Sequence, residues 1–374
     1  MNEKDINVLL VLDSMGSGGV QRLAINLIQE FINSKITVTL LLYNQQSEHF
    51  LCADLQDKIK IVSRSKDPGF SFTSLSMIIK EFRNQYDCVY SFQPTANIYC
   101  AISKILVPKR RLICCEFSLS NPWENKIRRA VANIANNIAS GVICNTHAQA
   151  AYLRKRIFTG GKVRVAWNGY PKVTRSKEDY RLNKPIKISL IGRIAFPKNG
   201  LTFLKAIDLF QKRNDTEVEI RWVGRQDSDN KSRKMFSQMI EYLELNEKLF
   251  SSWTWVGELS DVTKIYKTSD LIILPSLYEG LPSVICEAMM AGCPVVCSNI
   301  SDNHLLLGDK ERGLLCDPTD PLSICESIEA FCDLSPVKRK EIAERAIKFA
   351  QQQLTIEQMA NHYISLLPHV SDIE

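Results

Sequence analysis

Short apolar runs alternate with longer amphipathic stretches along the first 170 residues, and this alternation constrains the fold more than any other feature of the chain. The apolar runs are 6–12, 36–43, 59–63, 87–92, 111–115, 141–145 and 162–167, and the amphipathic stretches are 19–33, 73–86, 94–106, 123–139 and 146–156. Strands that alternate with helices form βαβ units, and their crossover connections make the strands parallel. The first part of the chain is therefore predicted to be a Rossmann-like α/β domain.

A second alternation follows, with helices between predicted strands near 186–192, 217–223, 252–256, 271–275 and 294–297. Two helices are expected near 336–351 and 355–367, and the apolar stripe of the last one consists of Leu354, Met359, Tyr363, Leu366 and Leu367. The stretch 168–185 is polar and lacks apolar periodicity, which is typical of a linker. Because 374 residues suit two domains, we predict an N-terminal domain, a linker, a C-terminal domain and a terminal helical segment over 1–170, 171–184, 185–352 and 353–374.

The composition indicates a soluble globular protein, with 45% hydrophobic and 24% charged residues. No apolar stretch reaches the ~18 residues that span a bilayer. The run 6–12 leads directly into a glycine loop, so we interpret it as a first strand rather than a signal peptide. The 12 cysteines are scattered, mostly in apolar runs, without any Cys-x-x-Cys pair. We therefore expect buried free thiols in a reducing cytoplasm rather than disulfides or zinc ligands.

Positive charge is concentrated in the first half of the chain. Residues 1–172 contain 22 Lys and Arg against 12 Asp and Glu, a net charge of +10, whereas the remaining residues contain 25 against 29, a net charge of −4. Within 101–172 the balance is 13 against 2. Such a surface attracts a phosphorylated acceptor or an anionic membrane face, and an ordinary solvated surface is the alternative. No helix-turn-helix, zinc or aromatic-rich RNA-binding pattern accompanies the charge, so nucleic acid is not an expected partner.

Two glutamates, Glu279 and Glu287, lie in the most distinctive run of the chain, residues 276–287. The apolar run 271–275 predicts a buried parallel strand, and a turn and a helix that ends near Gly292 follow it. Glu279 is thus expected at the carboxyl end of a strand, where open parallel sheets bind ligands, and Glu287 is expected two turns along the helix. Helix N-termini bind phosphate and carboxylates bind hydroxyl groups, and a nucleotide-sugar needs both. An ordinary strand–loop–helix unit with solvated glutamates is the alternative.

A glycine-rich loop, Met15-Gly-Ser-Gly-Gly-Val-Gln-Arg22, follows the first predicted strand. Its glycines permit positive φ and let backbone amides approach a ligand, and the next helix would direct its N-terminus at that ligand. The rival interpretation is the NAD-binding fingerprint. That fingerprint needs a third glycine where Gln21 stands and an acid near Asn44, at the end of the second strand. Because both requirements fail, no dinucleotide cofactor is expected.

Arg193 and Lys198 lie in the loop of the run Ile191-Gly-Arg-Ile-Ala-Phe-Pro-Lys-Asn-Gly-Leu201, again at the carboxyl edge of a predicted sheet. A guanidinium and an ammonium group in one loop can hold a diphosphate from two sides. They would also stabilise the charge that grows as a nucleoside diphosphate departs. A generic basic loop is the alternative.

These three runs together resemble the signature of retaining GT-B glycosyltransferases of family 4, the group 1 enzymes of bacterial surface polysaccharide assembly. The resemblance covers nearly the whole chain. It implies two facing Rossmann-like α/β domains with parallel sheets, and a last helix that crosses back to the first domain. It assigns acceptor binding to the first domain and donor binding to the second. It also implies that no metal is needed, because two cations take the place of Mg²⁺.

The resemblance also implies roles for individual residues. Arg193, Lys198 and Glu279 would be catalytic, with Glu279 on the sugar hydroxyls and the two cations on the diphosphate. Glu287 would bind the ribose hydroxyls. The other donor-binding residues would be Gly18, Gly19, Gly257, Gly280, Leu281, Pro282, Ser283 and Val284. Pro282 replaces the glycine that is commoner in the family, which would alter how the sugar is seated.

The chain departs from the family on the acceptor side. Many members carry a histidine after the strand that corresponds to 111–115, whereas Glu116 is the only ionisable residue in this segment and is the candidate for that place. His147 is a second acceptor-side candidate, with a capping or surface role as its alternative. Asp227-Ser-Asp229 looks like the metal-binding Asp-x-Asp of a different glycosyltransferase fold, but a solvated polar loop is preferred and no metal site is expected.

We therefore expect a retaining hexosyltransferase that moves a sugar from a nucleoside diphosphate donor, a UDP-hexose or UDP-N-acetylhexosamine, to a saccharide acceptor. A lipid-diphosphate-linked saccharide would suit the basic first half, with the protein in the cytoplasm or peripheral on the inner face of the cell membrane. Three alternatives stay open: a sugar-nucleotide epimerase of the same fold, an NAD-dependent oxidoreductase, and a non-catalytic sugar-nucleotide binding protein.

Overall fold

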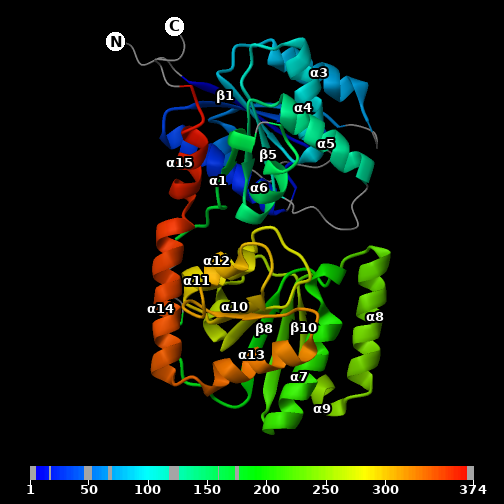
Figure 1. Ribbon diagram of the computed structural model, residues 1–374, viewed down its shortest axis with the longest axis vertical. Helices are drawn as coiled ribbons and strands as arrows, with labels where there is room; N and C mark the ends of the chain where they lie inside the picture. Colours follow the sequence, from blue (N-terminus) through cyan, green and yellow to red (C-terminus); the bar gives the residue numbers. More distant parts are fainter. Residues whose placement is uncertain are drawn as a thin grey trace. The chain divides into compact units, whose positions relative to one another are not determined.

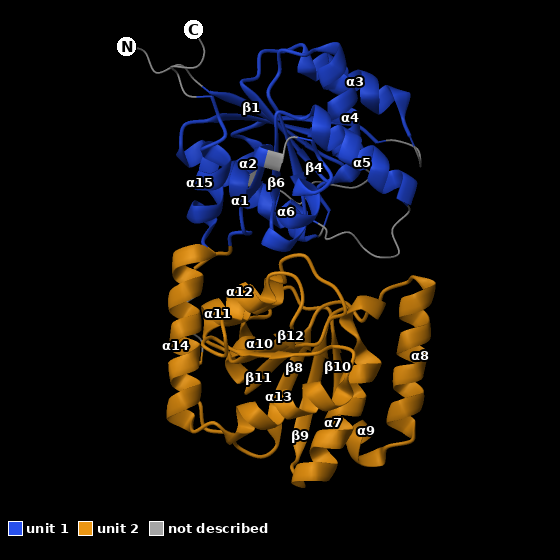
Figure 2. Cartoon of the chain, in the orientation of Figure 1, with its two compact units in different colours: residues 1–169, 355–374 blue, residues 170–354 orange. Residues whose placement is uncertain are grey.

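The computed structural model describes residues 6–16, 18–45, 53–65, 70–117, 126–158, 160–172 and 177–368. The chain divides into two compact units (Figure 2), of which unit 1 consists of 1–169 and 355–374 and unit 2 of 170–354. Each unit is built on one parallel sheet flanked by helices (Figure 1). The two Rossmann-like α/β domains predicted from the alternation of apolar runs and amphipathic stretches are therefore confirmed.

The sheet of unit 1 has seven strands in the order β3-β2-β1-β4-β5-β6-β7, and all neighbouring pairs are parallel. Its strands are β1 (Asn7–Leu12), β2 (Thr37–Leu42), β3 (Lys60–Ser63), β4 (Cys88–Phe92), β5 (Leu112–Glu116), β6 (Gly141–Cys144) and β7 (Val163–Val165). The central strands are buried on both faces, which explains why they read as continuous apolar runs.

The helices of unit 1 cover both faces of this sheet. They are α1 (Gly19–Asn33), α2 (Ala53–Gln56), α3 (Phe72–Phe82), α4 (Pro94–Leu106), α5 (Lys126–Ile138), α6 (His147–Arg154), the 3₁₀ turn η1 (Gly160–Lys162) and α15 (Ile356–Ile364). Successive residues of a strand point to opposite faces. Leu10 accordingly packs with α1 and α15, whereas Leu9 packs with α3, α4 and α5. The predicted helix at 123–139 is confirmed from Lys126 onward, and residues 123–125 lie outside the described part of the chain.

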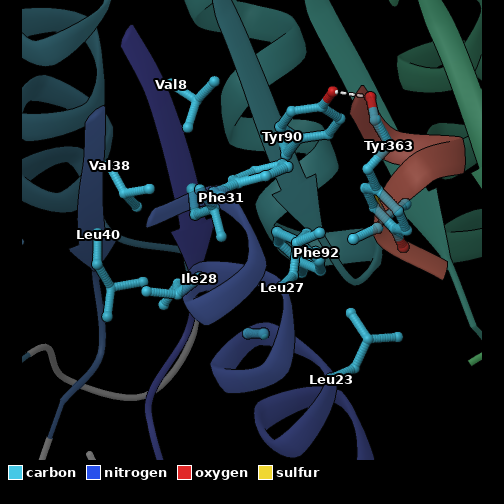
Figure 3. Close-up of a cluster of buried hydrophobic side chains, with 14 of the residues drawn as sticks. Val8, Leu23, Leu27, Ile28, Phe31, Val38, Leu40, Tyr90, Phe92 and Tyr363 are labelled. Atoms are coloured by element: carbon cyan, nitrogen blue, oxygen red, sulfur yellow. Dashed lines mark hydrogen bonds between the residues drawn. The ribbon is translucent and has the colours of Figure 1, made fainter. Parts of the chain in front are cut away.

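The last helix, α15, belongs to the core of unit 1. Its Tyr363 is fully buried, and the Tyr90 hydroxyl on β4 donates a hydrogen bond of 2.7 Å to the Tyr363 carbonyl oxygen (Figure 3). Phe31 of α1 lies against Tyr90, with ring centroids 5.9 Å apart. At its start the Thr355 side chain accepts a hydrogen bond from the Gln358 backbone N–H. The prediction that the terminal helix returns to the first domain through an apolar stripe is confirmed.

The sheet of unit 2 has six parallel strands in the order β10-β9-β8-β11-β12-β13. They are β8 (Ile186–Ile191), β9 (Val218–Val223), β10 (Trp253–Gly257), β11 (Leu271–Leu274), β12 (Val295–Ser298) and β13 (Leu314–Cys316). The helical elements are η2 (Phe196–Lys198), α7 (Gly200–Asn214), α8 (Asn230–Glu244), α9 (Glu247–Ser252), α10 (Thr263–Thr268), α11 (Ser283–Ala291), α12 (Asn303–Leu307), α13 (Pro321–Asp333) and α14 (Pro336–Gln353). Its core is centred on the buried Trp222.

Three elements of unit 2, namely α12, β13 and α13, were not predicted from the sequence, and the five residues of α12 are too few to show a helical period. β13 contains three residues, which is too short for a recognisable apolar period, and it pairs only with β12. α13 is a separate helix that ends before the predicted helix near 336–351. It begins at the Asp320 cap followed by Pro321, which together are a local helix start signal. Among the helices that the structure describes, none combines the length and the apolar character that crossing a membrane requires.

Candidate active site

The strands that carry most of the predicted site residues are neighbours in the unit 2 sheet. The chain runs from β8 to β9 on one side and later returns to β11 on the other side of β8, so the topological switch point lies between β8 and β11. Ligands bind outside the carboxyl ends of the strands at such a point. Arg193 follows β8, Asp227 follows β9 and Glu279 follows β11, so the topology brings these three residues to one edge of the sheet.

The side chains of Lys198 and Glu279 form an ion pair across this edge. The two side chains are only 21% and 16% exposed, so the contact is largely shielded from water. The loop of Lys198 is held by backbone and side-chain bonds. Leu277 N–H donates to the Pro197 carbonyl at 2.8 Å, and the Asn199 amide donates to the carbonyl of Pro275 at 3.0 Å. The predicted diphosphate cation and the predicted sugar-binding carboxylate are therefore already in contact.

Arg193 forms an ion pair with Asp227, and this pair links the ends of β8 and β9. The Asp227 backbone N–H also donates to the Ile194 carbonyl at 3.0 Å, which fixes the loop beside Arg193. The close approach of the strand ends requires glycine at position 224. Gly224 has a φ of +144°, and a Cβ there would lie 2.1 Å from the Gly192 carbonyl oxygen. The Arg193 guanidinium remains 58% exposed, so it is accessible to a ligand at the sheet edge.

Glu287 lies on α11 and accepts a hydrogen bond of 2.8 Å from the Tyr266 hydroxyl on α10. Tyr266 is buried, and burial together with the neighbouring Glu287 carboxylate raises the pKa of its hydroxyl well above the ordinary value. The phenol therefore stays protonated as a donor at neutral pH. It holds one carboxylate oxygen of Glu287, and the sequence analysis did not identify this partner.

The N-terminus of α11 follows the Glu279 loop directly. Pro282 is the N-cap residue, and no side chain caps the helix, while Gly292 ends it in the left-handed conformation with a φ of +73°. Leu281 and Pro282 are buried, Ser283 is exposed, and Gly280 and Val284 are half-buried. The first backbone N–H groups of a helix have no partner within it and attract anions. Gly257 is the last residue of β10 and has a φ of +82°. It pairs with Val223 at the end of β9.

In unit 1, the glycine loop lies at the carboxyl end of β1 and leads into α1. Gly18 is the N-cap residue of α1, and a Cβ at Gly18 would lie 2.3 Å from the Gln21 side-chain oxygen. Gly19 is exposed, and a Cβ there would meet nothing within 4 Å. The Gln21 amide donates to the Ser14 carbonyl at 3.3 Å. Gln21, which breaks the NAD fingerprint, therefore braces the loop instead.

Glu116 is buried at the end of β5, with 5% exposure. Its Oε1 accepts hydrogen bonds from the Asn97 amide of α4 at 2.9 Å and from the Asn136 amide of α5 at 3.1 Å. These bonds tie the strand to two helices, an anchoring role that the sequence analysis did not foresee. His147 is the exposed first residue of α6, and its ring lies edge-on to Trp167 with centroids 5.8 Å apart.

The Asp227-Ser-Asp229 run is explained by local contacts. Asp227 pairs with Arg193, and the Asp229 side chain accepts hydrogen bonds from the N–H groups of Lys231 and Ser232, which caps α8. The capping bonds hold the pKa of Asp229 below its ordinary value. Within the described ranges, no three His, Cys, Asp or Glu side chains gather as metal ligands do.

Two family models match adjacent parts of the chain. The model described as Glycosyltransferase Family 4 matches residues 17–172, and the model described as Glycosyl transferases group 1 matches residues 173–352.

Two bacterial glycosyltransferases are similar to this chain over most of its length. The GalNAc-alpha-(1->4)-GalNAc-alpha-(1->3)-diNAcBac-PP-undecaprenol alpha-1,4-N-acetyl-D-galactosaminyltransferase of Campylobacter jejuni is 24% identical over 314 residues, which cover 84% of this chain and 81% of the relative. The amylovoran biosynthesis glycosyltransferase AmsD of Erwinia amylovora is 23% identical over 295 residues, with coverage of 77% and 80%.

Among solved structures, HepE of Anabaena in complex with UDP and glucose matches with a TM-score of 0.78 at 18% identity, and the match covers 96% of this chain and 98% of that one. At this identity the likeness shows a shared fold. Because the two family models together span nearly the whole chain, the protein belongs to the family 4 glycosyltransferases, enzymes of the GT-B fold.

Proposed function

We propose that the enzyme moves a hexose or N-acetylhexosamine from a UDP donor to a hydroxyl group of a saccharide acceptor, with retention of the anomeric configuration. The domain 185–352 binds the donor and the domain 1–170 binds the acceptor, with 171–184 as the linker and 353–374 as the segment that returns to the first domain. One observation carries the proposal. Lys198 and Arg193 lie with Glu279 at the switch point of the unit 2 sheet, where such sheets bind nucleotides.

In this proposal Arg193 and Lys198 bind the diphosphate and stabilise the negative charge that grows as UDP leaves. Lys198 exchanges its contact with Glu279 for a phosphate oxygen, and the Glu279 carboxylate then binds sugar hydroxyls. When no donor is bound, the ion pair between Lys198 and Glu279 compensates the two charges, which are largely shielded from water. The two cations take the place that Mg²⁺ has in metal-dependent glycosyltransferases.

Further donor contacts come from α11 and from three glycine-containing segments. Glu287, held by Tyr266, binds the ribose hydroxyls. The backbone from Leu281 to Val284 faces the sugar and the diphosphate, with N–H groups from Leu281, Ser283 and Val284, since Pro282 has none. The other donor-binding residues are Gly18, Gly19, Gly257 and Gly280, and the segment that ends at Gly257 lies by the base. On the acceptor side, His147 is the exposed candidate, and Glu116 acts as an anchor that shapes the end of β5.

Retention follows from attack on the face that the leaving group vacates. The bond between the anomeric carbon and the UDP oxygen breaks, and the acceptor oxygen bonds to that carbon on the same side. The leaving β-phosphate oxygen takes the acceptor hydroxyl proton. No protein nucleophile takes part in this scheme, in which the Glu279 carboxylate binds sugar hydroxyls.

The relatives support a choice of donor and acceptor. The Campylobacter jejuni relative is named for transfer of N-acetylgalactosamine to a saccharide on PP-undecaprenol, and the Anabaena structure contains UDP and glucose. We propose a UDP-sugar as donor and a lipid-diphosphate-linked saccharide as acceptor, in the assembly of a surface polysaccharide. The enzyme would then work in the cytoplasm, peripheral on the inner face of the membrane, where the positive charge of residues 1–172 favours anionic lipids.

Thermal unfolding tests the donor assignment. The wild type, Glu287→Ala and a control, Glu244→Ala on the exposed side of α8, are heated with UDP, GDP, NAD and several UDP-sugars. A ligand at about 100 times its dissociation constant stabilises the fold by about 2.7 kcal/mol, a shift of a few degrees. UDP and one UDP-sugar are expected to stabilise the wild type and the control, and to stabilise Glu287→Ala less.

Turnover separates the remaining alternatives. The stabilising UDP-sugar is incubated with a lipid-diphosphate saccharide, and the products are identified by mass. A lengthened saccharide and free UDP are expected. Conversion of the UDP-sugar without an acceptor product would indicate an epimerase. Stabilisation by NAD alone in the thermal unfolding experiment would indicate an oxidoreductase. Binding of the donor without any turnover would indicate a non-catalytic binding protein.

A further inference from the structure

Five aliphatic side chains are exposed on α4 and α5. The exposed fractions are 62%, 61%, 74%, 38% and 59% for Ile105, Leu106, Ile127, Val131 and Ile134. The three on α5 are spaced four and three residues apart, so they form one stripe along the helix. The opposite side of α5 packs into the core of unit 1. We call these five residues the α4–α5 ridge.

The two helices lie side by side and run in the same direction (Figure 1). Near their N-termini the Arg128 guanidinium of α5 donates to the Thr95 hydroxyl of α4 at 3.4 Å. Near their C-termini the Lys104 ammonium of α4 donates to the Ser140 hydroxyl, just after α5, at 3.0 Å. These contacts place the exposed end of α4 beside the C-terminal end of α5, so the ridge is one surface feature.

Basic residues border the ridge. Lys126 and Arg128 lie in the first turn of α5, and Lys109 and Arg111 follow the end of α4, all four of them exposed. In the described part of 101–172, the one acidic residue is Glu116, and it is buried. The surface around the ridge therefore combines exposed aliphatic groups with positive charge, and among the described residues of 101–172 no exposed carboxylate offsets that charge.

We propose that the α4–α5 ridge is a docking surface for an anionic lipid bilayer. Aliphatic groups flanked by Lys and Arg bind at the boundary between lipid headgroups and acyl chains, and each cation near the surface adds attraction to acidic lipids. A second copy of the chain fits less well, because self-association through this ridge would bring like charges together. The ridge would be the surface through which the enzyme contacts the membrane, and this proposal rests on the function proposed above.

Vesicle co-sedimentation at low salt tests the proposal. The probe is a vesicle of equal parts phosphatidylglycerol and phosphatidylcholine, with phosphatidylcholine alone as the neutral comparison. The wild type is expected to bind the acidic vesicles and to be released by high salt. The double substitution Ile127→Ser/Ile134→Ser should weaken binding by about a hundredfold, since each inserted aliphatic group contributes about tenfold. Lys109→Gln/Lys126→Gln should weaken it about twenty-fivefold, about fivefold for each cation.

Matched controls lie on unit 2. Leu245→Ser/Val337→Ser changes side chains that are 83% and 67% exposed, and Lys205→Gln/Lys234→Gln removes two exposed cations. Neither control should alter vesicle binding. Equal binding by the ridge variants and the wild type would overturn the proposal, as would an equal loss in the controls. So would a dimer in solution that the ridge substitutions alone dissociate. UDP stabilisation of every variant, measured alongside, shows that the donor site is intact and keeps this test separate from that of the proposed function.

Discussion

At the residue scale, the carboxyl edge of the unit 2 sheet is organised by contacts between oppositely charged side chains. Lys198 pairs with Glu279, and Arg193 pairs with Asp227; both cations lie in the loop after β8, and the two carboxylates follow β11 and β9. In the proposed function, a diphosphate would therefore compete with protein carboxylates for both cations. An ion pair between exposed side chains contributes only about 0–1 kcal/mol to stability. A phosphate that replaced the carboxylate beside each cation would keep the charge compensated, so we expect a bound donor to displace the pairs at small cost. In that proposal, the same pairs also hold the cations near the positions that the phosphates would take.

Glu279→Gln should separate the two parts of donor binding. The substitution releases Lys198 from its carboxylate partner, so UDP is expected to bind about threefold more tightly. A UDP-sugar is expected to bind about tenfold more weakly, because the sugar hydroxyls lose a charged acceptor. Isothermal titration calorimetry with UDP and the UDP-sugar measures both changes. Glu244→Gln on α8 is the control and should change neither; weaker binding of UDP itself by Glu279→Gln would contradict the assigned competition.

At the scale of elements, α15 is the part of the C-terminus that completes unit 1. Met359, Ala360 and Tyr363 fill the space over β1 and β4 beside α1. The Tyr90 hydroxyl is the polar link in this otherwise apolar contact. Burial raises the pKa of Tyr90 well above its ordinary value, so the hydroxyl remains a donor throughout the neutral range.

Tyr90→Phe should loosen this contact. The Tyr363 carbonyl oxygen loses the Tyr90 hydroxyl but keeps the Leu366 backbone N–H as a donor at 3.1 Å, so the loss is that of one hydrogen bond, about 0.5–1.5 kcal/mol. The free energy of unfolding in urea should fall by that amount, and the amides of α15 should exchange hydrogen faster. Tyr152→Phe is the matched control, because the buried Tyr152 hydroxyl has no hydrogen-bond partner. A loss of stability in the control equal to that of Tyr90→Phe would show that the hydrogen bond is unimportant.

At the scale of the whole molecule, both cores contain reduced cysteines. The 11 cysteines of the described residues are all free, and 10 of them are buried, as predicted; Cys52 lies outside these residues. Burial raises the pKa of the Cys88, Cys114 and Cys293 thiols to about 12. The pKa of Cys325 rises to about 11 and that of Cys100 rises further still.

These thiols should make the protein lose stability in alkaline solution. Above about pH 9 the unfolded chain releases thiol protons that the folded protein retains, so the free energy of unfolding falls as the pH rises, by about 1.4 kcal/mol per pH unit for each fully titrating thiol. Below pH 8 both states keep these protons, and the thiols cause no slope. Urea unfolding under reducing conditions between pH 7 and pH 10.5 measures the effect. Cys297→Ala should reduce the slope by the contribution of one thiol proton. A free energy of unfolding that does not change between pH 7 and pH 10.5 would contradict the prediction.

Much of the fold follows from local sequence patterns. The strands of unit 1 appear within two residues of their predicted ends, because buried parallel strands are continuous apolar runs. The helix α1 coincides with its predicted span, since its apolar period and glycine start are local. β13 was not predicted, because a strand of three residues is defined by its pairing with β12 rather than by its own sequence.

The candidate site divides in the same way. That Arg193, Lys198 and Glu279 follow strand ends could be derived from the order of elements alone, as could the place of Glu287 on the helix. Their partners could not. Tyr266 lies in a short helix without a motif, and the anchoring of Glu116 depends on two asparagines that are 19 and 20 residues away in the chain.

The sequence by itself indicated the family through the resemblance of its motifs. It also determined the two parallel sheets and the edge at which the charged residues lie, because periodicity, capping and glycine placement act over a few neighbouring residues. Only the tertiary structure decided which charges meet. Lys198 and Glu279 are 81 positions apart, and they touch because β8 and β11 are adjacent in the sheet. Side-chain pairing acts over a few ångströms in space, so it depends on a strand order that no local pattern encodes.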